Sequence, residues 1–202
     1  EVSGRNDAGY LQDDPLYGED GRPIVSTVWW VDPQSLPPEA VSAVRVHEVL
    51  ADNRSYSATD GTTPDLVELH NSGADAVDLG GLSMSDSLDT PRRFVFPAST
   101  FLEPGGFLVV MAGPASALPG HHLGFGLRAS GDALFLFDAA ARGGRLLDAV
   151  QFGLQAPDLS IGRGPDGVWV PGRPSLGRPN EPVPLGDGND LKINEWLASE
   201  RP

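Results

Sequence analysis

The chain has 202 residues, 40% of them hydrophobic, with no cysteine and a formal net charge of −14. This length suits one domain of about 100–200 residues that buries a core without disulfides or metal, and the lack of cysteine excludes thiol catalysis, thiolate zinc sites and disulfide frameworks. The negative charge repels phosphate backbones, so nucleic-acid binding is not expected, and no sequence stretch approaches the ~20 apolar residues of a membrane helix.

Residues 1–41 are acidic and rich in turn formers, and we interpret them as an N-terminal segment and linker. Within them Ile24–Val31 is β-prone and stops at Asp32-Pro33. This run is either the last strand of a preceding module or a strand that docks onto the module that follows. The proline-rich stretch from Ser35 to Glu39 is typical of a stiff linker.

From Val44 onward, short β-type runs alternate with Gly, Pro and Asp turns at the spacing of an antiparallel sandwich. The runs are Val44–Leu50, Leu66–His70, Ala76–Met84, Arg93–Phe96, Phe107–Met111, Ala133–Phe137, Leu146–Phe152, Leu159–Gly162 and Val168–Val170. Helical periodicity is confined to Pro114–Leu118. Phe107–Met111 and Ala133–Phe137 are apolar at almost every position, which predicts strands covered on both faces or partly covered by loops.

The beginning of this region recurs near the C-terminus. Val44–Arg54 reappears as Leu191–Arg201 at a constant offset (195 − 48 = 147), with Glu, Leu, Ala and Arg at matching places. Such a period predicts a modular array, so we expect one module at 42–181, followed at 182–202 by a linker and the first strand of another repeat. Because the chain also begins without Met, we expect it to be part of a longer protein.

The order of the motifs, more than any one of them, carries a resemblance. The motifs are Val46–Ala51, Asp65–Asn71, Val77–Asp86, Arg93–Pro97, Leu102–Val110, Leu127–Asp132, Asp148–Phe152, Ser160–Gly167 and Pro174–Asn180. This series resembles the lamin tail domain in its bacterial exported form, over about residues 42–181.

The resemblance implies an all-β fold, an immunoglobulin-like antiparallel β-sandwich. It implies no catalytic residues and no cofactor, because the family shares none. The expected role is that of a structural or interaction module in a bacterial exported multidomain protein, located extracellularly, on the cell surface or in the periplasm, with a protein or cell-surface partner and neighbouring modules of the same chain. The alternative is an accessory domain of an extracellular enzyme that binds carbohydrate or nucleic acid.

Two acidic residues in predicted strands, Glu48 and Glu68, are the most notable carboxylates. Strict alternation places Glu68 with Leu66 and His70, and it places Glu48 on the face of Val44, Val46 and Leu50. A buried acid costs free energy unless a partner reaches it.

Arg163, within Gly162-Arg163-Gly164, is the candidate partner for one of these glutamates. A carboxylate pair could perform acid/base chemistry, but no nucleophile accompanies this one in a family motif. We therefore interpret Glu48, Glu68 and Arg163 as structural, in an ion pair or with a glutamate capping backbone groups at a sheet edge. His47 and His70 become neighbours if their two strands pair.

One segment offers candidate ligands for a cation. Asp187, Asn189 and Asp190 surround Gly188 in the linker before the repeat restarts. Oxygen ligands at nearby positions around a glycine turn fit the coordination preferences of Ca²⁺. Calcium is thus the best cofactor candidate that the sequence offers, against the alternative of ordinary solvated turns.

Overall fold

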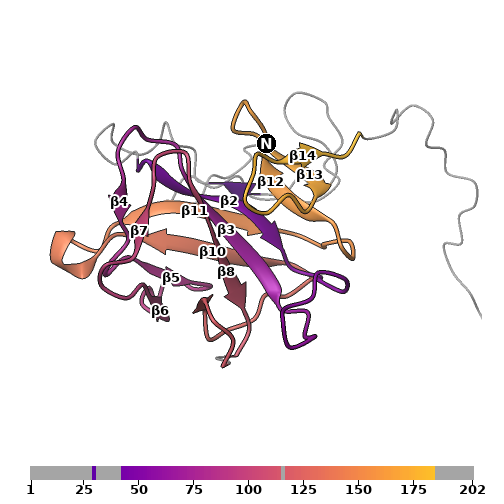
Figure 1. The fold of residues 1–202 in the computed structure, drawn as a ribbon, viewed down its shortest axis with the longest axis horizontal. Coiled ribbons are helices and arrows are strands. Elements are labelled where there is room, and N and C mark those ends of the chain that lie inside the picture. Colours follow the sequence, from indigo (N-terminus) through magenta and orange to yellow (C-terminus); the bar gives the residue numbers. More distant parts are fainter. Residues whose placement is uncertain (1–28, 31–41, 115–116, 185–202) are drawn as a thin grey trace, which may run out of the picture.

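In the computed structural model the described residues are 29–30, 42–114 and 117–184 (Figure 1). They form two packed β-sheets and a small ribbon. The first sheet has the order β1 (Trp29–Trp30), β11 (Leu146–Phe152), β10 (Asp132–Phe137), β5 (Ser83–Ser85), β6 (Phe94–Val95). The second has the order β14 (Glu181–Pro182), β13 (Trp169–Arg173), β12 (Ser160–Arg163), β2 (Val44–Leu50), β3 (Asp65–Asn71), β8 (Phe107–Ala112), β9 (His121–His122). The ribbon pairs β4 (Val77–Asp78) with β7 (Phe101–Leu102).

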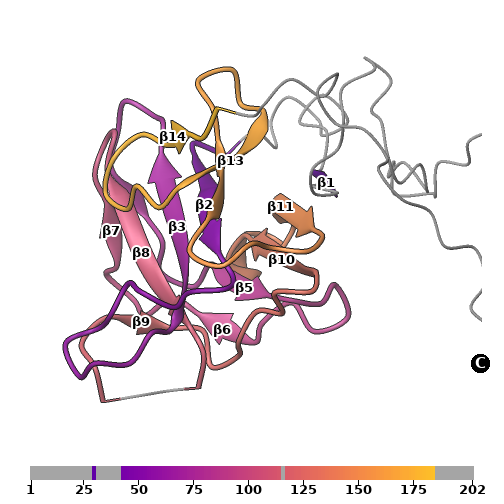
Figure 2. The same cartoon turned by 90° about the vertical axis from the view of Figure 1, so that its right-hand side faces the viewer.

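The pairings are antiparallel except for the parallel pair of β8 and β9. Figure 2 shows the two layers, with β3 and β8 in one and β10 and β11 in the other. This architecture confirms the predicted all-β antiparallel sandwich. Each predicted run overlaps at least one of these strands, but β7, β9 and β14, two residues each, were not predicted.

Two predicted elements differ from the observed ones. The run Ala76–Met84 splits into β4 and β5 because the chain turns between them, with Gly81 at φ 82° and the Leu82 N–H donating to Leu79 O. The predicted turn of helix at Pro114–Leu118 lies partly outside the described residues. The helical turn that the described residues contain is η2 (Ala140–Arg142).

The core lies between the two sheets and is built from alternate residues of each strand. Its central residues are fully buried: Val44, Val46, Val49, Val67, Leu69 and Val110 from one sheet, Met84, Leu134, Leu136 and Val150 from the other. A second cluster of Phe135, Phe137 and Ala149 lies on the opposite side of β10 and β11. The prediction that Ala133–Phe137 is covered on both faces is therefore confirmed.

A bulge in β2 changes which residues face the core. Val46 pairs with Leu69 and Glu48 pairs with Glu68, so His47 has no partner on β3. The extra residue shifts the alternation by one. Beyond the bulge Val49 joins the core, and Glu48 points to the outer face. The predicted placement of Glu48 with Val44 and Val46 is wrong for this reason.

The two described residues of the N-terminal segment pair with this module. Trp29 lies opposite Gln151 and Trp30 opposite Val150, antiparallel to β11. The sequence analysis offered a strand that docks onto the following module as one alternative, and this pairing is observed for these two residues.

Candidate functional site

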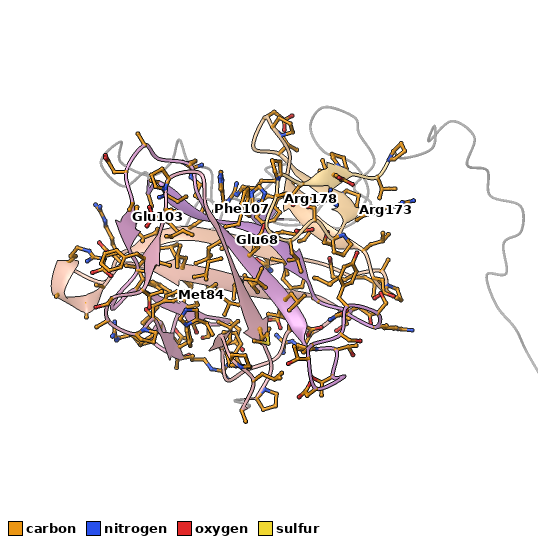
Figure 3. The ribbon with its side chains drawn as sticks, viewed as in Figure 1. Glu68, Met84, Glu103, Phe107, Arg173 and Arg178 are labelled. Carbon is orange, nitrogen blue, oxygen red and sulfur yellow. The ribbon has the colours of Figure 1, made fainter. Side chains whose placement is uncertain are left out.

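The outer face of β2 and β3 carries two acids directly opposite each other. Glu48 and Glu68 are cross-strand partners and are 1% and 0% exposed. Figure 3 shows Glu68 on the layer formed by β2, β3 and β8. Burial raises the pKa of Glu68 to about 7, with a further contribution from the nearby Glu48. Burial also raises the pKa of Glu48, against hydrogen bonds that favour its ionised form, among them one from the Ser160 hydroxyl at 2.5 Å.

Residues 174–180, which we call the clasp, supply backbone donors to both acids. The Ser175 N–H donates to the two carboxylate oxygens of Glu48 at 3.0 and 3.1 Å. The Gly177 N–H donates to Oε1 of Glu68 at 2.5 Å. The two glutamates therefore cap backbone groups of a segment more than a hundred residues away, and Oε2 of Glu68 is buried without a hydrogen-bond partner.

The end of the clasp is fastened by Asn180. Its side-chain amide donates to the carbonyls of His47 at 3.0 Å and Arg163 at 2.9 Å. The same side chain lies so close to Gly162 that a Cβ there would come within 2.4 Å of it. A side chain at position 162 would displace the Asn180 amide from these hydrogen bonds, so Gly162 leaves room on β12 for the end of the clasp.

Arg163 does not pair with either glutamate, which corrects the predicted ion pair. Its Nη2 lies 2.7 Å from Oδ1 of Asp148, and both side chains are buried between the sheets. Asp148 also accepts the Val46 N–H at 2.8 Å, and Nε of Arg163 donates to Val46 O at 2.9 Å. The guanidinium lies 4.7 Å over the ring of Trp169. Arg163 points inward toward β11, whereas the bulge directs Glu48 outward.

An aromatic cluster lies on the same outer face as the glutamates. The rings of His70 and Phe107 stack at 4.4 Å, and His47 lies 5.1 Å from each (Figure 3 labels Phe107). Pairing of β2 with β3 thus makes His47 and His70 neighbours, as expected. The pKa of His47 is lowered to about 4, mainly by burial. The His47 ring is therefore neutral at pH 7. Burial also lowers the pKa of His70.

The described residues contain no group of three or more His, Asp or Glu that could hold a metal ion. The calcium candidates Asp187, Asn189 and Asp190 lie outside the described residues, and calcium binding there stays a prediction.

A protein-family model described as Lamin Tail Domain matches residues 37–153. The chain belongs to the lamin tail domain family. This family consists of immunoglobulin-like modules that are generally non-enzymatic and serve interactions. The match spans β2 to β11, whereas β12–β14 and the clasp follow it. A search of curated proteins found no match.

The first prediction concerns the buried ion pair of this lamin tail domain. Replacing Arg163 by Met leaves Asp148 buried without its cation, which typically costs about 3–5 kcal/mol. Urea unfolding should show this loss of stability. The control, R178A, removes a pair with Glu181 that is more than half exposed and should cost no more than about 1 kcal/mol. Equal, small losses for both variants would contradict the structural role of Arg163.

The second prediction concerns pH. Because the folded-state pKa of Glu68, about 7, lies above its ordinary 4.5, the folded chain keeps a proton that the unfolded chain releases. The resulting stabilisation is complete below about pH 4.5 and is lost as pH rises through about 7.

Glu68→Gln keeps the acceptor for Gly177 and removes the buried charge. The variant should therefore have a Tm near the wild-type value at pH 4.5 and a higher Tm at pH 8. The exposed Glu103 provides the control, since E103Q should follow the wild-type pH profile. A wild-type Tm that exceeds that of E68Q at pH 8 would show that the ionised carboxylate is stabilising.

Proposed function

We propose that this lamin tail domain is a non-catalytic interaction and spacer module of an exported multidomain protein, which contacts a protein or cell-surface partner. The observation that carries the proposal is that the buried acids form hydrogen bonds within the module. Each acid buried in the described part of the chain accepts at least one hydrogen bond from the module itself: Glu48, Glu68, Asp132, Asp138 and Asp148. An acid/base role would compete with bonds that hold the fold together.

The charge distribution supports a partner other than nucleic acid. The sequence has two short basic clusters, Arg92-Arg93 and Arg142 to Arg145. Acids lie near both, since Arg93 pairs with Asp86, and Arg142 and Arg145 lie beside Asp138. The whole chain has a net charge of −14, which opposes the concentrated positive field that binding to phosphate backbones requires.

An exported, modular setting is supported by the acidic composition and by the partial repeat at 191–201. Within the described residues, no helix is both long and apolar enough to cross a membrane. Short, stiff linkers between such modules would fix the distance between neighbouring modules, which is what a spacer does.

This proposal is tested in the parent protein. In-frame deletion of residues 42–184 should reduce retention of the protein on the cell surface or in its partner complex, and any enzymatic activity of other domains should persist. Fractionation after a salt wash measures the retention. Loss of a catalytic activity with unchanged retention would show that the module is part of an enzyme.

One observation favours a second candidate, carbohydrate binding. The half-buried rings of His70 and Phe107 form a stacked pair on the outer face of β3 and β8, and aromatic rings are common contacts for sugars.

If the stacked pair contacts a glycan, F107A should weaken binding to that polysaccharide about 2–10-fold, the value of one aromatic contact. Isothermal titration across a polysaccharide panel measures this change. Phe101, 59% exposed on the β4–β7 ribbon, provides the matched control F101A, which should bind like the wild type. If no polysaccharide binds the wild-type chain, the carbohydrate candidate is excluded for that panel.

A further inference from the structure

The two glutamates under the clasp form a pair of like groups at one position of the sheet. Glu48 lies opposite Glu68 in the β2–β3 pairing, and neither side chain is more than 1% exposed. Residues at opposite positions have Cβ atoms about 4.5–5.5 Å apart, and like charges there are destabilising. Two buried carboxylates at such a separation are costly to ionise together unless a cation or water reaches them.

The arginines around the pair do not neutralise it. In the described part of the chain, no ion pair includes either glutamate. Arg163 on β12 is directed inward to Asp148. Arg178 on the clasp pairs with Glu181 on β14, and both of these side chains are more than half exposed. Arg173, at the end of β13, is also exposed.

The other strands next to the pair supply no cation to it either. Arg45 on β2 lies opposite His70, on the far side of the bulge from the pair. His47 has a pKa of about 4, and burial also lowers the pKa of His70. On β8 the residue opposite Glu68 is the uncharged Val109. The charge that acts on Glu68 is therefore the negative one of its partner glutamate.

The clasp supplies most of the donors that the pair receives. The Ser175 N–H donates to both oxygens of Glu48, and the Gly177 N–H donates to Oε1 of Glu68. The Ser160 hydroxyl is a further donor to Glu48. Oε2 of Glu68 is buried and has no hydrogen-bond partner, and such an oxygen carries negative charge at a high cost. A closed clasp therefore favours a protonated pair, whereas an open clasp lets water hydrate two carboxylates.

We propose that Glu48 and Glu68 hold one proton between them while the clasp is closed, and that loss of this proton releases the clasp while the sandwich stays folded. The core cluster between the sheets contains no residue of the clasp, so the outer face can open without breaking the core. The pair is thus a pH-sensitive catch on this face of the module. This inference goes beyond the proposed function, because it requires no partner.

The direction of the pH dependence follows from proton binding. The pKa of Glu68 is about 7 in the closed form, and it returns toward the ordinary 4.5 where water reaches the carboxylate. The closed form therefore binds the proton more tightly. Closing is most favoured below about pH 4.5, and the clasp opens more readily as the pH rises through about 7.

The first test measures opening of the clasp in the full chain. Native-state amide exchange, followed by NMR and corrected for the intrinsic rate at each pH, gives the opening equilibrium at Ser175 and Gly177. This equilibrium should rise about tenfold from pH 6 to pH 8, as the two pKa values of Glu68 require. The core amides of Val67 and Leu134 should stay at least about tenfold more protected than the clasp amides at both pH values.

Each part of the proposal has a result that overturns it. Equal protection of clasp and core amides would show that the clasp opens only when the sandwich unfolds. Protection of the clasp that is the same at pH 6 and pH 8 would overturn the link to a proton. Glu68→Gln should abolish the tenfold rise, and the exposed control E103Q should keep it. A rise that persists in E68Q would overturn the role of Glu68.

The second test counts the proton directly. Carbon-13 labelling of the glutamate carboxyl groups, with E48Q and E68Q to assign the signals, follows both titrations by NMR. The wild-type pair should release about one proton between pH 5 and pH 9. In E48Q, Glu68 should titrate at a lower pH, because the negative charge that raises its pKa is gone. Two carboxylates that are both ionised at pH 5 would overturn the shared proton.

Discussion

The bulge at His47 is the constraint on which the rest of the module depends. One extra residue in β2 leaves the Val46 N–H and C=O without ladder partners, because pairing of β12 with β2 ends at Glu48. Asp148 from the opposite sheet takes the N–H, and Arg163 takes the C=O. The ion pair thus completes the backbone hydrogen bonding at the bulge and joins three strands, β2, β11 and β12, across the sandwich. Buried backbone groups rarely remain unpaired, and the ion pair supplies partners for both groups of Val46 beside the bulge.

The same bulge places an acid on the outer face, and the clasp depends on it. Glu48 and Glu68 are costly there, since burial disfavours their ionised forms. The two carboxylates hold the clasp in place, because their oxygens accept hydrogen bonds from the N–H groups of Ser175 and Gly177. The clasp connects β13 to β14 and turns at Ser175–Arg178, so no neighbouring strand satisfies those donors. Apolar residues at 48 and 68 would hold the clasp by contact but would leave its backbone donors unpaired, at a cost of about 1–3 kcal/mol each.

The sequence predicts the scaffold much better than the site. β-branched and aromatic runs between Gly, Pro and Asp turns locate the long strands, because burial of alternate side chains leaves a periodic signal. Two-residue strands such as β7 and β9 carry no period. The bulge has no signal either, since histidine is not a residue that marks one, and alternation therefore assigned Glu48 to the wrong face. The clasp donors for the two glutamates include the backbone amides of Ser175 and Gly177, a group that nearly every residue type has. The sequence carries two traces of the clasp: Gly162, which lies close to the Asn180 side chain, and Gly177, whose φ of 82° favours glycine in a turn.

Several of the hydrogen bonds and ion pairs described above join the matched span to segments on either side of it. The shared span, residues 37–153, contains both glutamates and Asp148, yet the groups that satisfy them lie beyond it on β12 and the clasp, at Arg163, Ser175 and Gly177. The strand on the β11 edge comes from the other side, ahead of the match. The sandwich is therefore completed by flanking segments, which meet it through backbone hydrogen bonds and through the Arg163–Asp148 ion pair. The C-terminal flank also uses particular side chains, since the Asn180 amide donates to the carbonyls of His47 and Arg163. This flank is therefore part of the folded module and not an exchangeable attachment.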